Sequence, residues 1–462
     1  MNRLPNAASS IRSTLADALP GHQQRLHGAA RSVRFDDVLS GTCLGGRINE
    51  LVGRSVVVDT REQLAAALAL IELDGTARRL IVCPPDLAAE HRRAVVDKTG
   101  ADAVVSDRDG DVEWPVPRFV ACNSSVTPSA ATPADRFHTE WVLLTSGTTG
   151  APKLIAHTFD TLTAPMRNRP VPHHSVVWGT FYDIRRYGGL QILLRAVLGH
   201  ASFVVSGVDE SIAGYILRLA QRLATHISGT PSHWRRALMS AEARALAPHY
   251  VRLSGEIADQ GILNALGACY PHARISHAFA STEAGVGFEV NDGLEGFPAS
   301  VVGDTGDVQI GVEGGSLRIR SDRVAVRFVG DEARLADKSG FVDTGDVVER
   351  RGDRYYFLGR RSGIINVGGL KVYPEEVESA INRHPAVRMS MVRAARSSMV
   401  GSLVAADVVL DQTPDVSADA AAFKREIRQI CIDTLAPHKV PATIRFVPTL
   451  EFAAAGKLAR HA

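Results

Sequence analysis

Short β-rich runs alternate with helical stretches from residue 55 onward, and this alternation restricts the possible folds more than any other feature of the chain. Apolar runs at residues 55–58, 80–83 and 103–106 predict strands, and helical spacing of apolar residues predicts helices at 61–73 and 88–99. Strands that alternate with helices of this length form layered α/β domains with a largely parallel sheet. We therefore predict an α/β fold for the first part of the chain.

The alternation returns after residue 200 and then gives way to a different texture. A strand is predicted at 202–206, followed by helices at 210–226 and 232–245. Past residue 300, short β segments are separated by glycine turns, which indicates a small antiparallel or barrel-like subdomain. These β segments are 308–310, 316–320 and 324–329.

A domain boundary is expected near Gly359, because a compact α+β pattern follows it. Pro374 opens a helix at a position where its missing N–H costs nothing. The further elements predicted in this part are strands at 387–392, 403–410 and 444–447 and a helix at 418–435. We predict a large layered α/β body with a small β subdomain at residues 1–359, and a mobile α+β lobe at residues 360–462.

Composition removes several classes of function. The 462 residues are 45% hydrophobic and 22% charged, with a net charge of +2, which argues against nucleic-acid and membrane partners. The five cysteines form no CxxC pair, so neither a disulfide framework nor a zinc site is predicted, and a cytoplasmic location fits best. Residues 1–34 are rich in Arg and Ser like a transit peptide, but a short amphipathic helix at 11–19 is the favoured interpretation.

A Gly/Thr-rich loop carries the first chemical signal. It follows a strand end and consists of Thr145, Ser146, Gly147, Thr148, Thr149, Gly150, Ala151, Pro152 and Lys153. Consecutive backbone N–H groups, threonine hydroxyls and a terminal cation suit phosphate oxygens. The string GxxxxGK[ST] is absent, so this is not a Walker A loop. A flexible surface loop with an incidental lysine is the alternative, but the complete string favours phosphate binding.

The loop resembles the signature phosphate loop of the adenylate-forming enzymes, which include acyl-CoA synthetases, peptide-synthetase adenylation domains and beetle luciferases. This resemblance predicts four further motifs in a fixed order, and all four are present between the loop and residue 457. It covers about residues 55–460. Each motif alone has a plain structural explanation, such as a helix cap, a β-turn or a solvated tail; their order argues for the family.

The first expected motif is the string from Phe279 to Glu283. By resemblance Thr282 would contact the α-phosphate, Glu283 would help to hold Mg²⁺, and Phe279 would lie against adenine. A hard cation that bridges phosphates prefers carboxylate oxygen, which agrees with Glu283 as its ligand. Upstream, Gly255 and Glu256 resemble the family's glycine-containing adenine wall.

The other motifs resemble the nucleotide, thiol and catalytic positions of the family. Asp346 would accept hydrogen bonds from both ribose hydroxyls, and Arg360 would touch ribose or phosphate. Gly369, in the loop before a PEEVE helix, would let a pantetheine arm pass close to the backbone. Lys457 near the end of the chain would bridge the attacking carboxylate and the α-phosphate.

The chain also departs from the family pattern. The region before the phosphate loop is short, Ser362 replaces the usual hinge acid or lysine, and Asn366 stands where many members have lysine. Residues 452–455 lack the usual Thr or Ser before the catalytic lysine. Domain rotation is still expected, since Gly363 next to the hinge keeps the backbone permissive.

The resemblance implies an enzyme that uses ATP and Mg²⁺ to convert a carboxylic acid into acyl-AMP and then into a thioester. CoA or a phosphopantetheine arm would be the thiol acceptor, and an aryl or fatty acid is favoured as substrate. The acid pocket is expected at Trp178, Phe181, Tyr182, residues 229–231 and Ala280. Catalytic roles are thus predicted for Lys457, Thr282, Glu283 and Lys153.

Alternatives stay open at this point. A stand-alone ligase that loads an acyl carrier protein differs from an acid–CoA ligase only in the acceptor. A non-catalytic scaffold relative is the alternative from another class of protein. The sequence also allows a homodimer. Asp183 near the expected pocket is interpreted as a turn residue. Arg185 and Arg186 are expected to be exposed. His173 and His174 have no partner at metal-ligand spacing, so a surface pair is predicted.

Overall fold

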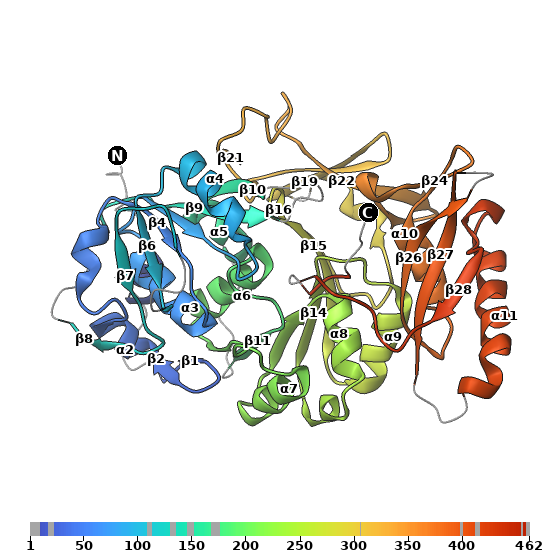
Figure 1. Ribbon diagram of the computed structural model, residues 1–462, viewed down its shortest axis with the longest axis horizontal. Helices are drawn as coiled ribbons and strands as arrows, with labels where there is room; N and C mark the ends of the chain where they lie inside the picture. Colours follow the sequence, from blue (N-terminus) through green and yellow to red (C-terminus); the bar gives the residue numbers. More distant parts are fainter. Residues whose placement is uncertain are drawn as a thin grey trace.

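The computed structural model describes residues 10–16, 23–108, 113–129, 135–145, 152–167, 176–304, 306–397, 401–411, 416–453 and 456–458. Figure 1 shows an α/β part with the first sheet (blue), a second sheet (green) and a C-terminal lobe (orange to red) arranged along the long axis. Among the described residues, none of the helices combines the length and apolarity needed to cross a bilayer.

The first sheet has seven strands. Their order is β21 (Arg327–Phe328), β10 (Lys153–Thr158), β9 (Glu140–Thr145), β5 (Arg79–Val82), β4 (Ser55–Val58), β6 (Ala103–Ser106) and β7 (Phe119–Ala121). The strands from β9 to β7 are parallel, and β10 and β21 join antiparallel at one edge. Helix α3 (Gln63–Leu73) is buried along its whole length, which explains its nearly continuous apolar sequence. Helix α4 (Ala89–Thr99) packs into a separate core of this sheet.

The second sheet has eight strands and is also mainly parallel. Their order is β16 (Gly285–Val290), β15 (Arg274–Ser281), β14 (Tyr250–Ser254), β13 (His226–Gly229), β11 (Val177–Thr180), β12 (Ser202–Val204), β1 (Arg25–His27) and β2 (Ser32–Arg34). Helix α6 (Tyr187–Leu198) packs on this sheet and shares a core with α3 and the first sheet. Helices α7 (Ile212–Gln221), α8 (Pro231–Leu238) and α9 (Gln260–Cys269) enclose a second core against the same sheet.

A third sheet of six antiparallel strands forms the small β subdomain. Their order is β17 (Phe297–Pro298), β23 (Arg354–Arg360), β22 (Val342–Arg351), β20 (Ser316–Ser321), β19 (Val308–Glu313) and β18 (Gly303–Asp304). The smaller elements of the body are α1 (Ile11–Ala16), α2 (Phe35–Ser40), β3 (Gly41–Thr42), β8 (Thr127–Pro128) and α5 (Phe159–Thr163).

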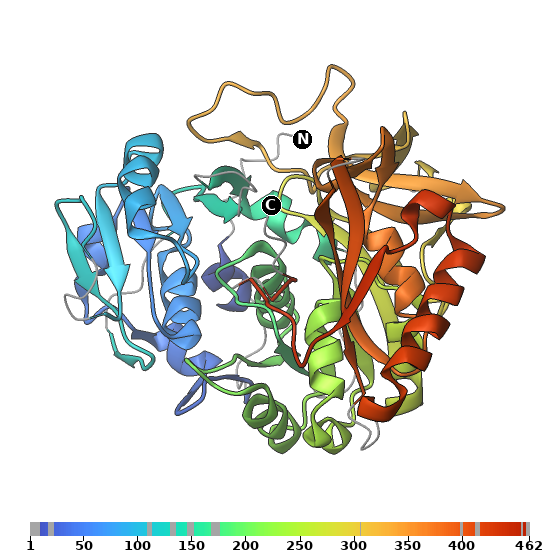
Figure 2. The same cartoon turned by 45° about the vertical axis from the view of Figure 1, so that its right-hand side comes forward.

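The C-terminal lobe has its own core between two helices and a three-stranded sheet. Its elements are β24 (Ile365–Val367), β25 (Leu370–Val372), α10 (Pro374–Ile381), β26 (Val387–Ser397), β27 (Gly401–Leu410), α11 (Val416–Thr434) and β28 (Thr443–Phe446). After β28 the chain leaves the lobe and runs back to the middle of the body beside α8, as the dark red segment in Figures 1 and 2 shows.

The predicted α/β class, the antiparallel β subdomain and the α+β lobe are confirmed. Four predicted elements are wrong in extent. The strand expected at 387–392 continues to Ser397 as β26. The helix expected at 210–226 ends at Gln221, because Leu223 has a positive φ of 53° and β13 begins at His226. The helix expected at 232–245 ends at Leu238, and a separate 3₁₀ turn follows. The strand expected at 324–329 is only the two residues of β21. Residues 17–19 of the predicted first helix lie outside the described residues.

Candidate active site

A hairpin between β9 and β10 holds both ends of the predicted phosphate loop. Thr145 and Lys153 are paired across it in antiparallel register. Ser146, Gly147, Thr148, Thr149 and Gly150 lie outside the described residues. Lys153 is exposed, and its Nζ lies 5.8 Å from the centre of the Phe328 ring, within range of a cation–π contact. The cation is thus placed at the loop's end.

The predicted Thr282–Glu283 pair follows β15 in the turn to β16 and is fixed by a histidine from the hairpin. His157 on β10 lies with its Nε2 2.8 Å from the Thr282 carbonyl oxygen and its Nδ1 2.9 Å from Thr161 Oγ1. Burial lowers the pKa of His157 to about 4, so the neutral ring donates its Nε2–H to that carbonyl. A hydrogen bond from the buried His157 ring therefore joins the β9–β10 hairpin to the Thr282 turn.

Phe279 lies on β15 with its ring between two other phenylalanines. Its centroid is 5.9 Å from that of Phe288 and 5.8 Å from that of Phe357, with nearly parallel planes. The ring is half-buried, so the β subdomain supports it from one side. Its expected contact with adenine stays a prediction.

Asp346 and Arg360 are paired across β22 and β23. Arg360 Nε donates to Asp346 Oδ1 over 3.1 Å, and the Asp346 carboxylate is the main cause of a raised pKa at Arg360. Asp346 Oδ2 is buried and has no hydrogen-bond partner within the described part of the chain. Because such an oxygen is costly to leave unpaired, it is available to a donor from a ligand. The adjoining hollow has a volume of about 410 Å³ and is lined by Thr344, Gly345, Arg360, Arg361 and Ser362.

Lys457 reaches this region from the C-terminal lobe. A β-carbon built on Gly255 would lie 3.5 Å from Lys457 Cε and 3.8 Å from its Nζ. Loss of hydration lowers the pKa of the Lys457 ammonium, and the negative charge of Glu256 opposes that shift. The residue as a whole keeps an exposed surface, so we regard the loss of hydration as partial. Asp346 and Arg360 also act on its charge, which places the predicted catalytic lysine and nucleotide pair in one site.

The backbone around Lys457 is docked on the first turn of α8. Thr230 Oγ1 donates to the Gly456 carbonyl over 3.2 Å, and the Leu458 N–H donates to Glu256 Oε1 over 3.3 Å. Gly456 has φ +70°, and a β-carbon there would overlap the His233 imidazole. Only glycine fits this position, because both its conformation and its contact exclude a side chain.

Glu256 was expected in the adenine wall, which stays a prediction, and its carboxylate is hydrogen-bonded to α8 and to the tail. It accepts from the Ser232 N–H over 2.9 Å and the Ser232 hydroxyl over 3.0 Å, besides the N–H of Leu458. The Ser232 N–H belongs to the first turn of α8 and has no partner within the helix, so an acid is favourable there. The Glu256 carboxylate thus links α8 to the tail that carries Lys457 by hydrogen bonds.

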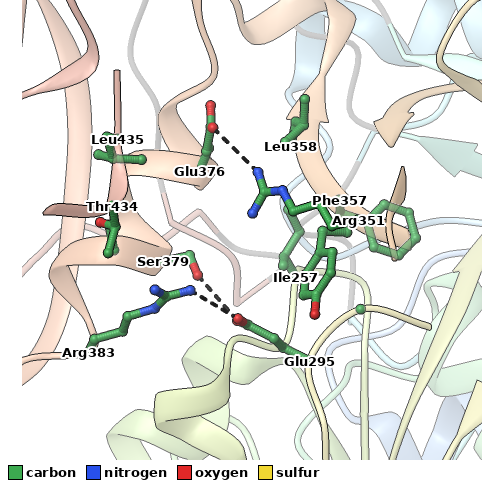
Figure 3. A pocket seen from close by; sticks show the side chains of 13 residues that line it. Ile257, Glu295, Arg351, Phe357, Leu358, Glu376, Ser379, Arg383, Thr434 and Leu435 are labelled. Carbon is green, nitrogen blue, oxygen red and sulfur yellow. Dashed lines mark hydrogen bonds and ion pairs between the residues drawn. The ribbon is translucent and has the colours of Figure 1, made fainter. Parts of the chain in front are cut away.

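Ion pairs span a narrow crevice between the body and the lobe, which Figure 3 shows from close by. Glu295 of the body accepts from Arg383 over 3.2 Å and from Ser379 over 3.4 Å, both on the lobe. Arg351 of the body lies 3.9 Å from Glu376 of the lobe. The cavity between them measures about 70 Å³. The lobe is therefore held on the body by charge as well as by its tail.

Gly369 lies outside this site. It is in the exposed turn between β24 and β25 with φ +87°, and a β-carbon there would meet no atom within 4 Å. Ser362 lies in the short 3₁₀ turn Arg361–Gly363 that joins the β subdomain to the lobe. The lobe thus carries Lys457 in the site and Gly369 away from it.

The aromatic residues expected around the acid are mostly core. Trp178 packs on His226 at 4.8 Å between ring centroids, and Phe181 packs on Trp234 at 5.2 Å. Tyr182 donates its hydroxyl to the Ser254 carbonyl over 2.7 Å, and so borders the strand end before Gly255.

For the polar residues near the expected acid pocket, the prediction for Asp183 is confirmed and those for Arg185 and Arg186 are wrong. Asp183 is a turn residue, as predicted, because its carboxylate binds the backbone and side chain of Arg185. The expectation that Arg185 is exposed is wrong: it is 3% exposed and also donates to the carbonyls of Thr60 and Arg61. Arg186 is half-buried and pairs with Asp86, so it is not a freely exposed arginine either. His173 and His174 lie outside the described residues.

Comparison with protein-family models decides the identity of the chain. The model described as "AMP-binding enzyme" matches residues 52–323, and the model described as "AMP-binding enzyme C-terminal domain" matches residues 376–457. The chain belongs to the AMP-binding enzyme family. Lys457 is the last residue of the second match.

Similar proteins agree with this AMP-binding enzyme assignment. A 2-succinylbenzoate–CoA ligase of Bacillus velezensis is 24% identical over 89% of this chain and 82% of its own length. The human mitochondrial acyl-coenzyme A synthetase ACSM5 is 33% identical, but the match covers 36% of this chain and 30% of that protein. The chain therefore spans less than a third of the length of this second relative.

Solved structures share the fold. The anthranilate–CoA ligase AuaEII, in complex with anthranoyl-AMP, has a TM-score of 0.78 at 18% identity and covers 98% of this chain and 96% of its own. The o-succinylbenzoate–CoA synthetase of Bacillus subtilis, with an acyl-adenylate intermediate, has a TM-score of 0.72 at 18% identity, with coverage of 97% and 96%. This AMP-binding enzyme thus has the fold of those enzymes along nearly its whole length.

Sequence reasoning missed two histidines that organise this AMP-binding enzyme. His157 has no local signal, because its partner Thr282 is 125 residues away. His233 does have one: Thr230 caps α8 and Pro231 opens it, so His233 is the third helical residue of a capping box. Burial lowers the pKa of His233 to about 3, and its neutral ring forms the surface on which Gly456 rests.

Proposed function

We propose that this AMP-binding enzyme activates a carboxylic acid with ATP to form acyl-AMP and then transfers the acyl group to a thiol, with CoA as the favoured acceptor. The observation that carries the proposal is Lys457 of the lobe lying against Gly255, beside the Asp346–Arg360 pair. A relative that aligns over most of the chain is named a CoA ligase, and a structural neighbour holds an acyl-AMP.

The nucleotide would be held by groups that the fold brings together. Asp346 Oδ2 would accept from a ribose hydroxyl, and Arg360 would remain paired with Oδ1 while facing ribose or phosphate. Lys153 and the N–H groups of its loop would contact the phosphates, and Thr282 the α-phosphate. Phe279 and the Gly255 backbone would flank the base.

Mg²⁺ fits the donor set as an ion carried by the nucleotide. The described residues contain no cluster of three metal-ligating side chains, and Mg²⁺ in such sites commonly uses one or two carboxylates with substrate phosphates. Glu283, half-buried in the turn beside Thr282, is the carboxylate that would hold it. The ion would supply positive charge to the phosphates of ATP.

In the first half-reaction the carboxylate of the acid attacks the α-phosphorus, and pyrophosphate leaves. Both reactants are anions, so positive charge near the forming bond lowers the barrier. Lys457 would donate to the carboxylate and to an α-phosphate oxygen, and the tail contacts with Thr230 and Glu256 would hold it there.

In the second half-reaction a thiol attacks the acyl carbonyl, and AMP leaves. Lys457 would then be withdrawn by rotation of the lobe at Ser362, and the hairpin with Gly369 would turn toward the acyl-AMP. The exposed position of Gly369 and the docked position of Lys457 correspond to the first half-reaction. An aryl or fatty acid is the favoured class of substrate, since the names of the relatives include a succinylbenzoate–CoA ligase and acyl-CoA synthetases.

ATP–pyrophosphate exchange over a panel of aryl, fatty and amino acids tests the first half-reaction. Acyl transfer from the best acid to CoA and to a pantetheinylated carrier protein then tests the acceptor. Exchange followed by transfer to CoA would support the proposal. Transfer to the carrier protein but not to CoA would identify the carrier protein as the acceptor. Absence of pyrophosphate exchange with every acid would favour a non-catalytic scaffold.

A further inference from the structure

A row of buried polar residues crosses the second sheet where an apolar surface is the rule. Ser228, Arg252 and Ser276 are paired neighbours on β13, β14 and β15, so their side chains share one face. They are 1%, 4% and 0% exposed. Central parallel strands are usually apolar on both faces, because both are covered. Three polar residues in register therefore need an explanation.

Helix α6, which packs on the same sheet, adds two more buried polar groups (Figure 1). Tyr187 and Gln191 are 6% and 4% exposed and lie one helical turn apart, so they share a face of the helix. The Tyr187 hydroxyl and Gln191 Oε1 make no hydrogen bond within the described part of the chain. Unpaired buried polar atoms in native proteins commonly mark a site for water, an ion or a ligand.

Arg252 brings a positive charge into this buried row. Its closest carboxylate is Glu289, at 3.8 Å between Nη1 and Oε2, which is longer than a hydrogen bond. Glu289 is also shared with the Tyr250 hydroxyl at 2.7 Å and with Arg274 at 3.4 Å. The charge of Arg252 is therefore only partly balanced by the described residues.

Guanidinium groups also act on Tyr187. Burial raises the pKa of its hydroxyl, and three guanidinium groups, those of Arg252, Arg323 and Arg195, act against that rise. A planar guanidinium and a nearby phenol hydroxyl form a donor set suited to a carboxylate. The cluster thus has the chemistry of an anion site inside the body.

The cluster adjoins the catalytic centre on two sides. Arg252 precedes Gly255, the residue against which Lys457 lies, by three positions on the same chain segment. Tyr187 stacks on His157 with 5.5 Å between ring centroids, and His157 is hydrogen-bonded to the Thr282 carbonyl. An acid that reacts beside Lys457 and extends along β14 would place its far end at Arg252.

We propose that Arg252 and the Tyr187 hydroxyl bind a second carboxylate of the substrate, so that the enzyme selects a dicarboxylic acid. Gly255 follows Arg252 by three positions along extended backbone, so the two carboxylates would be roughly 10 Å apart. This inference rests on the proposed acid activation. It narrows the expected substrates to aryl or fatty acids that carry a second carboxylate at the end opposite the reacting one.

Matched pairs of acids in the pyrophosphate exchange assay test the inference. Nonanoate is compared with nonanedioate, and 3-phenylpropanoate with 3-(4-carboxyphenyl)propanoate. The wild-type enzyme is expected to favour the dicarboxylic member of at least one pair by tenfold or more in kcat/KM. Arg252→Met is expected to reduce that ratio to near one, mainly through KM, and Arg252→Lys to retain part of it.

Arg274→Met provides the matched control, because Arg274 pairs with the same Glu289 but has an exposed side chain. This variant should keep the wild-type preference. A wild-type preference for the monocarboxylic member in both pairs would overturn the inference. So would an Arg252→Met variant that keeps the full dicarboxylate preference.

A binding measurement separates failure of the inference from failure of the proposed activity. Thermal stabilisation by nonanedioate or by 3-(4-carboxyphenyl)propanoate is measured in the presence of AMP for the wild type, Arg252→Met and Arg252→Lys. Stabilisation of the wild type and Arg252→Lys, but not of Arg252→Met, would support the dicarboxylate site even without exchange. Absence of both stabilisation and exchange would overturn the inference together with the proposed activity.

Discussion

Gly456→Ala should separate the two half-reactions, because it blocks the docking of Lys457 without removing the lysine. In the structure Gly456 has φ +70°, and its α-carbon faces the His233 imidazole so closely that a methyl group would overlap the ring. The variant tail must therefore lift off α8. The hydrogen bonds from Thr230 to the Gly456 carbonyl and from Leu458 to Glu256 would be lost with it.

The expected cost follows from these contacts. A left-handed conformation costs about 1–2 kcal/mol for alanine relative to glycine, and each lost hydrogen bond costs about 1 kcal/mol. The docked state should thus be disfavoured by about 3 kcal/mol, which corresponds to about a hundredfold lower rate of acyl-AMP formation. In the proposed mechanism the second half-reaction does not use the docked tail, so thioester formation from supplied acyl-AMP should stay near the wild-type rate.

Single-turnover assays of each half-reaction measure this difference directly. Gly267→Ala on α9 is a matched control, since the nearest atom to its new methyl group would be 4.0 Å away. Adding His233→Ala to Gly456→Ala removes the obstructing ring and should recover about tenfold in acyl-AMP formation. Equal loss in both half-reactions, or no recovery in the double variant, would refute the docking explanation.

Three further predictions concern the Asp346–Arg360 pair, the ion pair between Glu295 and Arg383 in the crevice, and the buried His157. Asp346→Asn should weaken AMP binding by about 10- to 100-fold, because a charge-assisted hydrogen bond contributes about 1.5–3 kcal/mol; calorimetry with a change under threefold would contradict it. Glu295→Gln and Arg383→Met should each slow acyl-AMP formation about two- to fivefold, as expected for a partly exposed pair, and the double variant should match the singles; additive losses would argue against the pair. His157 has a folded-state pKa of about 4 against about 6.5 when unfolded, so its contribution is constant above pH 6.5 and stability falls as the pH drops from there toward 4. His157→Gln should remove about 2 kcal/mol of the loss between pH 7 and 5, seen as a smaller drop in Tm; an unchanged drop would refute this assignment.

The general architecture was predictable because the periodicity of the sequence matches it. Residues 55–58 and 103–106 alternate with helical segments and become β4 and β6 of the first sheet. The ends of the helices were less predictable, since tertiary contacts decide them. Residues 222–225, expected to be helical, turn instead at Leu223 so that β13 can enter the second sheet. No local sequence signal shows whether residues 222–225 continue the helix or form a turn.

Within the site, motifs indicated the residues but not their arrangement. The pairing of Asp346 with Arg360 follows from the register between β22 and β23, which could not be predicted from the sequence. Glu256 resembles an adenine-wall residue, yet its carboxylate is used to join α8 to the tail. The burial of Arg185 was not predictable, because the carbonyl groups it binds lie more than 120 residues earlier in the chain. Such long-range partners become visible only in the folded structure.

The most direct test of the account is acid-dependent ATP–pyrophosphate exchange by the wild type and by Lys457→Gln. The wild type should exchange pyrophosphate only when a suitable acid is present. Lys457→Gln should reduce the rate by at least a hundredfold while AMP binding remains, because Asp346 and Arg360, the proposed nucleotide contacts, are unchanged. Exchange at the wild-type rate by Lys457→Gln would contradict the central claim that the lobe delivers this lysine to the forming acyl-AMP.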